Sequence, residues 1–212
     1  DSELDVPESD AETCRTLRRA FESGEATPVE ILEEIRQRIG NGEFGESEHT
    51  PFAGHDQERA FDQAEASAER WANGEPLSPL DGVPVPIKDH HRQEGMPTSN
   101  GTAYFAEQEG PDSRDSEVVR RLADAGAILV GKSLVTEWGM QPTGFSPHFQ
   151  MPRNVHDSDH AAGGSSTGTA VAVGLGLAPV GLGSDGGGSI RIPAALNGLY
   201  GRRRRGLDAG GL

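Results

Sequence analysis

The stretch from Ala161 to Gly198 constrains this chain more than any other. It reads AAGGSSTGTAVAVGLGLAPVGLGSDGGGSIRIPAALNG, and it is rich in glycine and poor in charge. Its serines fall into two clusters, at Ser165–Ser166 and at Ser184–Ser189, with an apolar run between them. Glycine weakens a helix or strand by roughly 0.5–1 kcal/mol relative to alanine. So many glycines therefore indicate a backbone with special dihedral angles, or one that a ligand approaches closely.

Ser189 is a candidate nucleophile because of its setting. It follows three glycines, Gly186 to Gly188, and precedes a segment that is typical of a short helix. Backbone N–H groups at a helix N-terminus are unpaired, and flexible glycines allow them to turn toward a developing oxyanion. The alternative is that Ser189 only caps the helix, which is the commoner role for a serine at such a place.

A serine needs a base before it can attack a carbonyl at neutral pH. None of the seven histidines lies in a pattern that points to these loops. A neutral lysine can serve if burial lowers its pKa. The chain has two lysines: Lys88 ends the apolar segment GVPVPIK, and Lys132 follows the apolar run AILVG. The residues alone do not separate these two candidates.

Composition excludes several function classes. The formal net charge of −15 disfavours nucleic acid and anionic membranes as partners, and no apolar run approaches the roughly 18 residues of a membrane span. Cys14 is the only cysteine, so no internal disulfide can form. The acidic N-terminus lacks the features of a signal peptide, and we therefore expect a cytoplasmic protein.

Three short patterns suggest other chemistry but are weak. GLGSDG, at 181–186, matches a dinucleotide-binding pattern without a suitable second strand. HDSDH, at 156–160, lacks the spacing of a zinc-binding helix, and the arginine run at 202–205 is short. We therefore expect no cofactor, no metal and no nucleic acid.

Secondary-structure signals predict an α/β fold, with a mixed, largely parallel sheet covered by helices. Thr27 to Glu30 forms a capping box for a helix that ends at Gly40. The polar segment 41–55 is expected to be a loop. The other predicted elements are helices from the Ser9–Glu12 capping box to Ser23, over 56–73 and from Asp115 to Gly126, strands over 80–88 and 127–131, and helices after each serine loop.

We expect a single domain with three parts. Residues 1–79 form a helical layer, residues 80–201 a catalytic α/β core, and residues 202–212 an aberrant tail. The tail reads RRRRGLDAGGL, and its composition differs sharply from the residues before it.

Several motifs together resemble the amidase signature family of serine amidohydrolases. They are PLSPLDGVPVPIKDH, GMPTSNGT, RRLADAGAILVGKSLVTEWGM and GGSSTGTAVAVGLGLAPVGLGSDGGGSIRIPAALNGLYG, in that order, and the resemblance covers roughly residues 25 to 201. It implies a Ser–cis-Ser–Lys triad, in which Ser189 is the nucleophile, Ser165 the bridging serine and Lys88 the base. It also implies a cis peptide bond between Gly164 and Ser165.

The resemblance assigns further roles and a reaction. Lys132 would be structural, and the reaction would hydrolyse a small carboxylic amide through an acyl-enzyme, with no metal or cofactor. The other residues that it implies are the oxyanion-hole donors Gly186, Gly187, Gly188 and Ser189, and the supporting residues Ser166, Asp185 and Arg191.

The chain departs from the family pattern in three places. Thr167 stands where glycine is usual, and DGGGS stands where Asp-Thr-Gly-Gly-Ser is common. After Gly201 the family continues with a long C-terminal portion, so the chain resembles a C-terminally truncated member, as a frameshift would produce. An unfinished sheet with exposed strand edges would favour self-association.

Three functions remain open from the sequence. The first is a stand-alone amidase, which the stretch MQPTGFSPHFQMPRN favours. The second is the glutaminase subunit of a tRNA-dependent amidotransferase. The third is a catalytically silent fragment that keeps the motifs without the substrate pocket.

Overall fold

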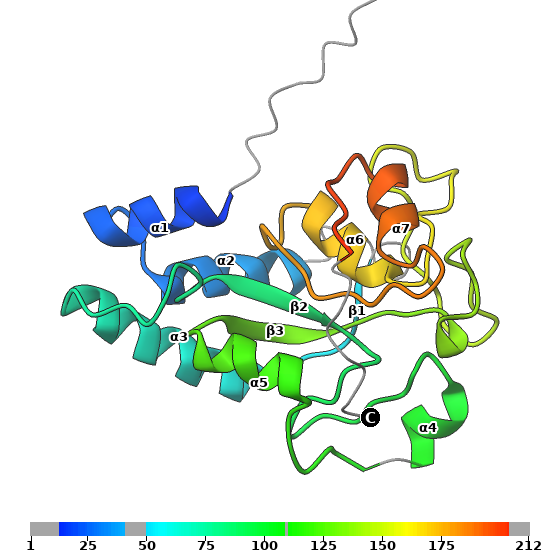
Figure 1. The fold of residues 1–212 in the computed structure, drawn as a ribbon, viewed down its shortest axis with the longest axis horizontal. Coiled ribbons are helices and arrows are strands. Elements are labelled where there is room, and N and C mark those ends of the chain that lie inside the picture. Colours follow the sequence, from blue (N-terminus) through cyan, green and yellow to red (C-terminus); the bar gives the residue numbers. More distant parts are fainter. Residues whose placement is uncertain (1–12, 41–49, 109, 204–212) are drawn as a thin grey trace, which may run out of the picture.

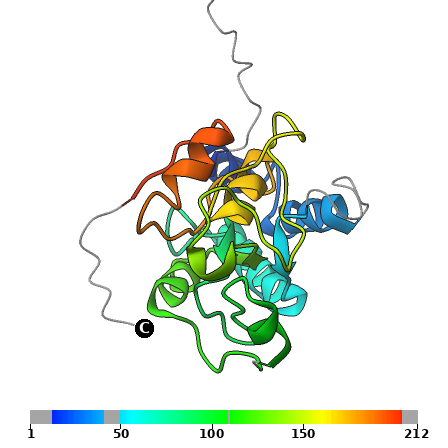
Figure 2. The same ribbon diagram turned by 90° about the vertical axis from the view of Figure 1, so that its right-hand side faces the viewer.

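The computed structural model describes residues 13–40, 50–108 and 110–203. A small sheet lies at the centre, with helices packed around it (Figure 1; Figure 2 gives the perpendicular view). The elements are α1 (Cys14–Ser23), α2 (Pro28–Gly40), β1 (Phe52–Gly54), α3 (Gln57–Ala72), β2 (Pro84–Lys88), α4 (Ala103–Gln108), α5 (Glu117–Asp124), β3 (Ile128–Ser133), the 3-10 helix η1 (Glu137–Gly139), α6 (Thr167–Gly174) and α7 (Arg191–Leu196).

The sheet is mixed and has the order β1-β3-β2. β2 and β3 are parallel, and β1 pairs antiparallel to β3. The register places Lys88 opposite Ser133 and Ile87 opposite Lys132. Both candidate lysines therefore lie at the carboxyl ends of neighbouring parallel strands. The α/β fold with a mixed sheet is confirmed, although half of its strand pairings are antiparallel.

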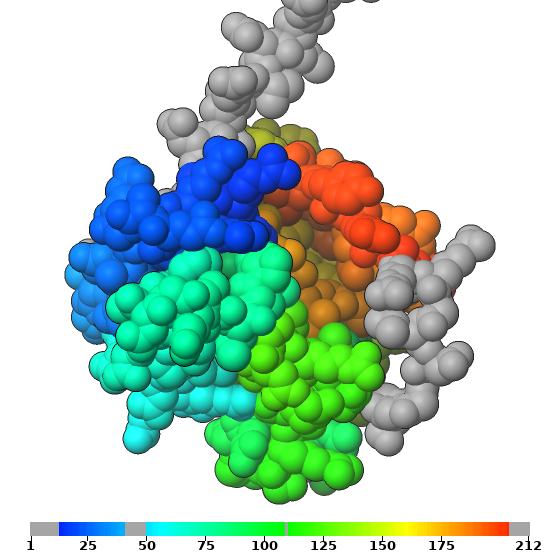
Figure 3. Space-filling view, turned by 60° about the vertical axis from the view of Figure 1, so that its left-hand side comes forward, coloured from blue at the N-terminus to red at the C-terminus, as the bar shows by residue number. Residues whose placement is uncertain are grey.

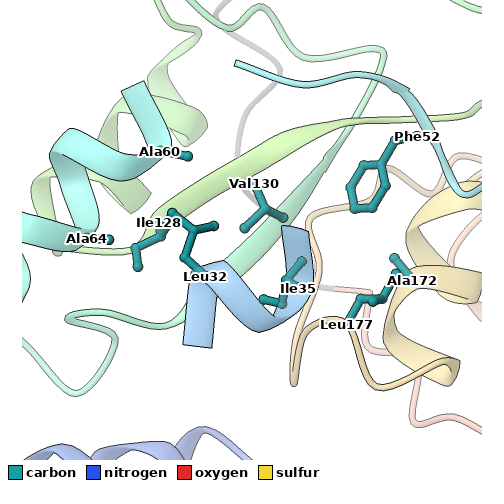
Figure 4. Packing of buried hydrophobic residues seen from close by; sticks show 9 residues of the cluster. All are labelled: Leu32, Ile35, Phe52, Ala60, Ala64, Ile128, Val130, Ala172 and Leu177. Atoms are coloured by element: carbon teal, nitrogen blue, oxygen red, sulfur yellow. The ribbon is translucent and has the colours of Figure 1, made fainter. Parts of the chain in front are cut away.

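Alternating residues of β3, together with Ala127 just before it, supply two hydrophobic cores, because successive side chains of a strand point to opposite faces. Figure 4 shows the first core, in which Ile128 and Val130 pack against α2, α3 and α6. In the second core, Ala127 and Leu129 pack with the apolar residues of β2 and with Val119 of α5. The continuous apolar run at 127–131 is thus explained by a strand covered on both faces.

Helices α2 and α3 begin where the local sequence predicts. In the capping box of α2, the Glu30 carboxylate accepts a bond from the Thr27 N–H at 2.8 Å, and the Glu30 N–H donates to Thr27 Oγ1 at 3.2 Å. Asp56 caps α3. Phe21 and Trp71 join α1 to α3, with ring centroids 5.8 Å apart. Figure 3 shows these helices, in blue and cyan, forming one continuous part of the surface.

Helix α6 lies very close to the end of β3. The Gly168 N–H donates to Leu134 O at 2.8 Å, and a side chain at Gly168 would lie 2.1 Å from Pro51 O. The glycine at this position therefore allows backbone-to-backbone contact. This contact fixes the serine loop that precedes α6 against the strand that carries Lys132.

Four details of the predicted secondary structure are corrected. The segment expected to be a loop contains β1, because Phe52 is buried in the first core and pairs with Ser133. Ser116, not Asp115, precedes α5, since the Asp115 carboxylate instead binds Arg59 at 2.5 Å. Helix α4 was not expected. The fourth detail, the start of α7, is described with the site.

Some predictions fall outside the described residues. They are the Ser9–Glu12 capping box and most of the 202–212 tail. In the described part, α1 begins after Thr13, whose hydroxyl accepts from Thr16 N–H at 3.2 Å. The division of the chain at residues 79 and 201 stays a prediction, although β1 makes the first part more than a helical layer.

Candidate active site

Lys88 is the last residue of β2, and its side chain is buried among hydroxyl and carbonyl oxygens. Its Nζ lies 2.8 Å from Ser165 Oγ, 2.9 Å from Ser184 Oγ and 3.2 Å from Ser184 O. No carboxylate forms an ion pair with it among the described residues. Burial therefore lowers the pKa of Lys88 to about 7, although the Asp185 charge opposes this effect. The Lys88 amine therefore loses its proton more readily than an exposed lysine does.

The loop that carries Ser165 and Ser166 lies between the end of β3 and the start of α6. The peptide bond between Gly164 and Ser165 is cis, as expected. Both serines are buried. The Ser165 hydroxyl contacts Lys88, whereas the Ser166 hydroxyl donates to Ser184 O at 3.3 Å and its N–H donates to Ser189 O at 3.0 Å. Ser166 thus joins the two serine loops.

Ser189 lies on the second serine loop, and the alternative that it only caps the helix is wrong. Helix α7 begins at Arg191, and Ile190 occupies the capping position. Ser189 is therefore not the helix cap. No hydrogen bond joins its hydroxyl to Ser165 or to any other described residue. The half-buried Ser189 hydroxyl is free to meet an incoming carbonyl group.

Asp185 organises the loop of Ser189. Its buried carboxylate accepts from the Gly188 N–H at 2.8 Å and from the Ile190 N–H at 3.2 Å, and it pairs with the Arg191 side chain at 2.9 Å. The Arg191 side chain and these N–H groups hold the pKa of Asp185 well below its usual range. Asp185 therefore remains an anion that shapes the turn.

This arrangement narrows the set of oxyanion donors. The Gly188 N–H is already bonded to Asp185, so it is occupied in this structure. The N–H groups of Gly186, Gly187 and Ser189 donate to no described residue. Gly186 and Gly187 are exposed, so a substrate oxygen can approach them.

Lys132 has a different environment from Lys88. Its Nζ lies 2.8 Å from Asp89 Oδ1, 2.8 Å from His91 O and 2.7 Å from Thr98 Oγ1. These three acceptors match the three N–H donors of an ammonium group. Lys132 thus joins the end of β3 to the segment after β2 through these contacts.

Two residues at the site were not found from the sequence. Ser184 supplies both its hydroxyl and its carbonyl to Lys88, and His90 lies with Nδ1 at 3.4 Å from Ser184 Oγ. The sequence around His90 does not indicate a role at the site, because the approach of His90 to Ser184 depends on a turn at the end of β2. The Ser184 contact depends on the parallel bridge between Ile87 and Leu182.

The segment 156–160 does not form a metal site in the described part of the chain. No group of three or more His, Cys, Asp or Glu residues in this part of the chain is arranged to hold a metal ion. In the 156–160 segment, His160 Nδ1 lies 2.9 Å from the Asp157 carboxylate, and both side chains are exposed. Over the same described residues, every helix is too short or too polar to cross a bilayer.

Comparison with curated proteins identifies related sequences. Residues 46–204 match the family model named Amidase. The chain is 42% identical over 189 residues to a fatty acid amide hydrolase of Arabidopsis thaliana, covering 88% of this chain and 31% of that protein. It is 40% identical over 186 residues to a glutamyl-tRNA(Gln) amidotransferase subunit from Symbiobacterium thermophilum, covering 87% and 37%. The chain therefore spans about a third of the length of these relatives.

Solved structures share the fold. A crystal structure titled as an amidase is 38% identical, with a TM-score of 0.76 over 88% of this chain and 41% of that one. Native peptide amidase from Stenotrophomonas maltophilia is 30% identical, with a TM-score of 0.80 over 90% and 39%. The family model covers most of the chain, and its match includes Lys88 and both serine loops. The chain belongs to the amidase family.

Proposed function

We propose that this protein hydrolyses a carboxylic amide through an acyl-enzyme on Ser189. The observation that carries the proposal is the buried Lys88 amine, which contacts Ser165 Oγ at 2.8 Å and has no carboxylate partner among the described residues. A buried amine of this kind is a general base near neutral pH. Metal and cofactor play no part in the steps that follow.

The reaction begins with proton transfer along the three side chains. Neutral Lys88 takes the Ser165 proton as Ser165 takes the proton of Ser189, whose oxygen attacks the amide carbon. The N–H groups of Gly186, Gly187 and Ser189 then donate to the developing oxyanion, and each such donor contributes about 10²–10³ in rate. Asp185 and Arg191 support this step because they fix the turn that holds the donors.

The second half of the reaction releases the products. The C–N bond breaks as the proton returns through Ser165 to the leaving nitrogen, which departs as ammonia or an amine. A water molecule then gives a proton to Ser165 and Lys88 in the same way and attacks the acyl carbon. This releases the carboxylic acid and restores the Ser189 hydroxyl.

The experiment combines a serine-directed fluorophosphonate probe with intact-mass measurement. The expected result is one adduct on the wild-type chain and none on Ser189→Ala. Ser113→Ala is the matched control, because Ser113 is an exposed serine on a different loop and its loss should leave the labelling unchanged. An adduct on Ser189→Ala would refute the assignment of the nucleophile.

A second candidate is the glutaminase subunit of a tRNA-dependent amidotransferase. Its support is the 40% identity to the glutamyl-tRNA(Gln) amidotransferase subunit from Symbiobacterium thermophilum. The same triad would then release ammonia from glutamine for a partner enzyme. Turnover of glutamine, compared with that of simple aliphatic and aryl amides, distinguishes the glutaminase from the stand-alone amidase. A wild-type chain that takes up no probe would instead favour a silent fragment. Cytoplasmic location stays a prediction from the N-terminal segment, and self-association stays a prediction from the unfinished sheet.

A further inference from the structure

The number of hydrogen-bonding groups on Lys88 sets a condition on its neighbours. A neutral amine has two N–H donors and one lone pair, and Nζ has three oxygen neighbours: Ser165 Oγ, Ser184 Oγ and Ser184 O. The Ser184 carbonyl can only accept. If the lone pair is to receive the Ser165 proton, the second N–H must go to Ser184 Oγ, which must then accept as well.

The Ser184 hydroxyl can meet this condition only if its own hydrogen points away from Lys88. Besides Lys88, its one hydrogen-bonding partner among the described residues is His90 Nδ1, at 3.4 Å. This distance is long, as such contacts often are before substrate binds. If Nδ1 accepts the Ser184 hydrogen, the hydroxyl oxygen remains turned toward Lys88.

The surroundings of His90 keep its ring neutral and in place. A side chain at Gly139 would lie 2.7 Å from His90 Cε1 and 3.1 Å from Ser165 Oγ, so the ring lies against the backbone that covers Ser165. Burial, together with the charges of Lys88, His91 and Lys132, lowers the pKa of His90 to about 3. Asp185 is the nearby anion that acts on Lys88.

We propose that His90 is a positioning residue, whose neutral ring accepts the Ser184 hydrogen at Nδ1 and so directs the Lys88 lone pair toward Ser165. The inference rests on the proposed function, in which Lys88 is the base. It assigns the ring proton of His90 to Nε2, which has no described hydrogen-bond partner.

The test measures Lys88 directly and needs no substrate. The chain has two lysines, so protein labelled with ¹³C and ¹⁵N at the lysine side chains gives two resonances, and Lys132 is an internal control. In His90→Phe, the Ser184 hydroxyl is released and can donate to the Lys88 lone pair. This stabilises the neutral amine, and the Lys88 pKa should fall by roughly 0.5–1 unit. An unchanged Lys132 resonance shows that the fold is intact.

His90→Asn is the matched variant, because its side-chain oxygen can replace Nδ1 as an acceptor. It should restore the wild-type Lys88 pKa. In a Ser184→Ala background, His90→Phe should cause no further shift, since the hydroxyl through which His90 acts is gone. A shift of equal size in that background would overturn the proposal, as would an unchanged Lys88 pKa in His90→Phe.

The ¹⁵N spectrum of the imidazoles gives a second, independent reading. The His90 signal, assigned by its loss in His90→Phe, should show the proton on Nε2. A proton on Nδ1 would overturn the proposal. The Lys88 pKa and the His90 spectrum are measured without substrate or turnover. If Ser189 failed to take up a fluorophosphonate, the hydrolase mechanism would be refuted and the proposal for His90 would still stand or fall on these two measurements.

Discussion

Lys88 and Lys132 occupy nearly equivalent places in the sheet. Each lies at the carboxyl end of a strand, the two strands are parallel neighbours, and each residue is 1% exposed. Their partners differ. Lys132 contacts the Asp89 carboxylate at 2.8 Å, whereas Lys88 contacts only hydroxyl and carbonyl oxygens. Burial alone thus does not decide what a lysine does.

The difference lies in the balance between desolvation and a compensating charge. Burial disfavours an ammonium group, and a neighbouring carboxylate restores it. Without one, the pKa of Lys88 falls to about 7, as its proposed role as a base requires. With one, Lys132 joins β3 to the segment after β2 through an ion pair. Four predictions test this contrast, from the largest expected effect to the smallest.

The largest effect is expected from loss of the base. Lys88→Met should slow fluorophosphonate labelling of Ser189 by about 10²–10⁴-fold, the usual contribution of a positioned general base. The measurement is the labelling rate by intact mass. Lys132→Met, assayed at a temperature where circular dichroism shows it folded, should lose less than tenfold. Equal losses in the two variants would remove the functional distinction between the lysines.

For stability, substitution of Lys132 should have a larger effect than substitution of Lys88. Lys132→Met leaves the buried Asp89 carboxylate without its counterion, so the free energy of unfolding should fall by about 3–5 kcal/mol. Urea denaturation measures this loss. The double variant Lys132→Met with Asp89→Asn removes both charges and should regain part of it. A Lys132→Met protein as stable as wild type would show that the ion pair contributes nothing.

The pH dependence follows from the direction of the Lys88 shift. Its pKa falls from 10.5 to about 7 on folding, so the amine gains activity as a base when pH rises through about 7. The labelling rate should increase tenfold per unit below that pH and level off above it.

The same shift has a consequence for stability. Above its unfolded pKa of 10.5, Lys88 is neutral in both the folded and the unfolded state. As pH falls from there toward 7, the unfolded state gains the proton first, so the free energy of unfolding declines. In Lys88→Met, both the kinetic inflection and this slope should disappear. An inflection that persists in this variant would assign the titration to another group.

The smallest effect concerns the hydroxyl partner of Lys132. Thr98 Oγ1 accepts from Lys132 at 2.7 Å and donates to Asp112 at 2.6 Å. Thr98→Val keeps the shape and removes both bonds, so unfolding should become easier by about 1–2 kcal/mol. The labelling rate of Ser189 should stay the same. A change in that rate without a change in stability would connect Lys132 to catalysis after all.

The sequence predicted local structure well where short-range rules decide it. The Thr27–Glu30 capping box and the apolar run of β3 act over a few residues, and both elements formed as expected. The roles of the lysines could not be predicted from the residues, because Lys88 and Lys132 both follow apolar segments. What separates them is Asp89, whose side chain turns to Lys132 although its neighbour in the chain is Lys88.

The remaining errors share this physical origin. Phe52 forms β1 because β3 provides an edge, and nothing near Phe52 in the chain encodes that pairing. Ser189 fits the pattern of a helix cap, yet Asp185 takes up the N–H groups of the turn and the helix starts at Arg191. His90 approaches Ser184 across 94 residues of sequence. Such contacts arise from the tertiary fold and leave little trace in local patterns.

The contact at Gly168 bears on how this protein could be engineered. Since α6 rests on the backbone of Leu134 and Pro51, the distance from the sheet to the serine loop is set by main-chain atoms. An engineered variant should therefore keep glycine at position 168. A single methyl group at Gly168 would push the whole helix outward and carry Ser165 away from Lys88.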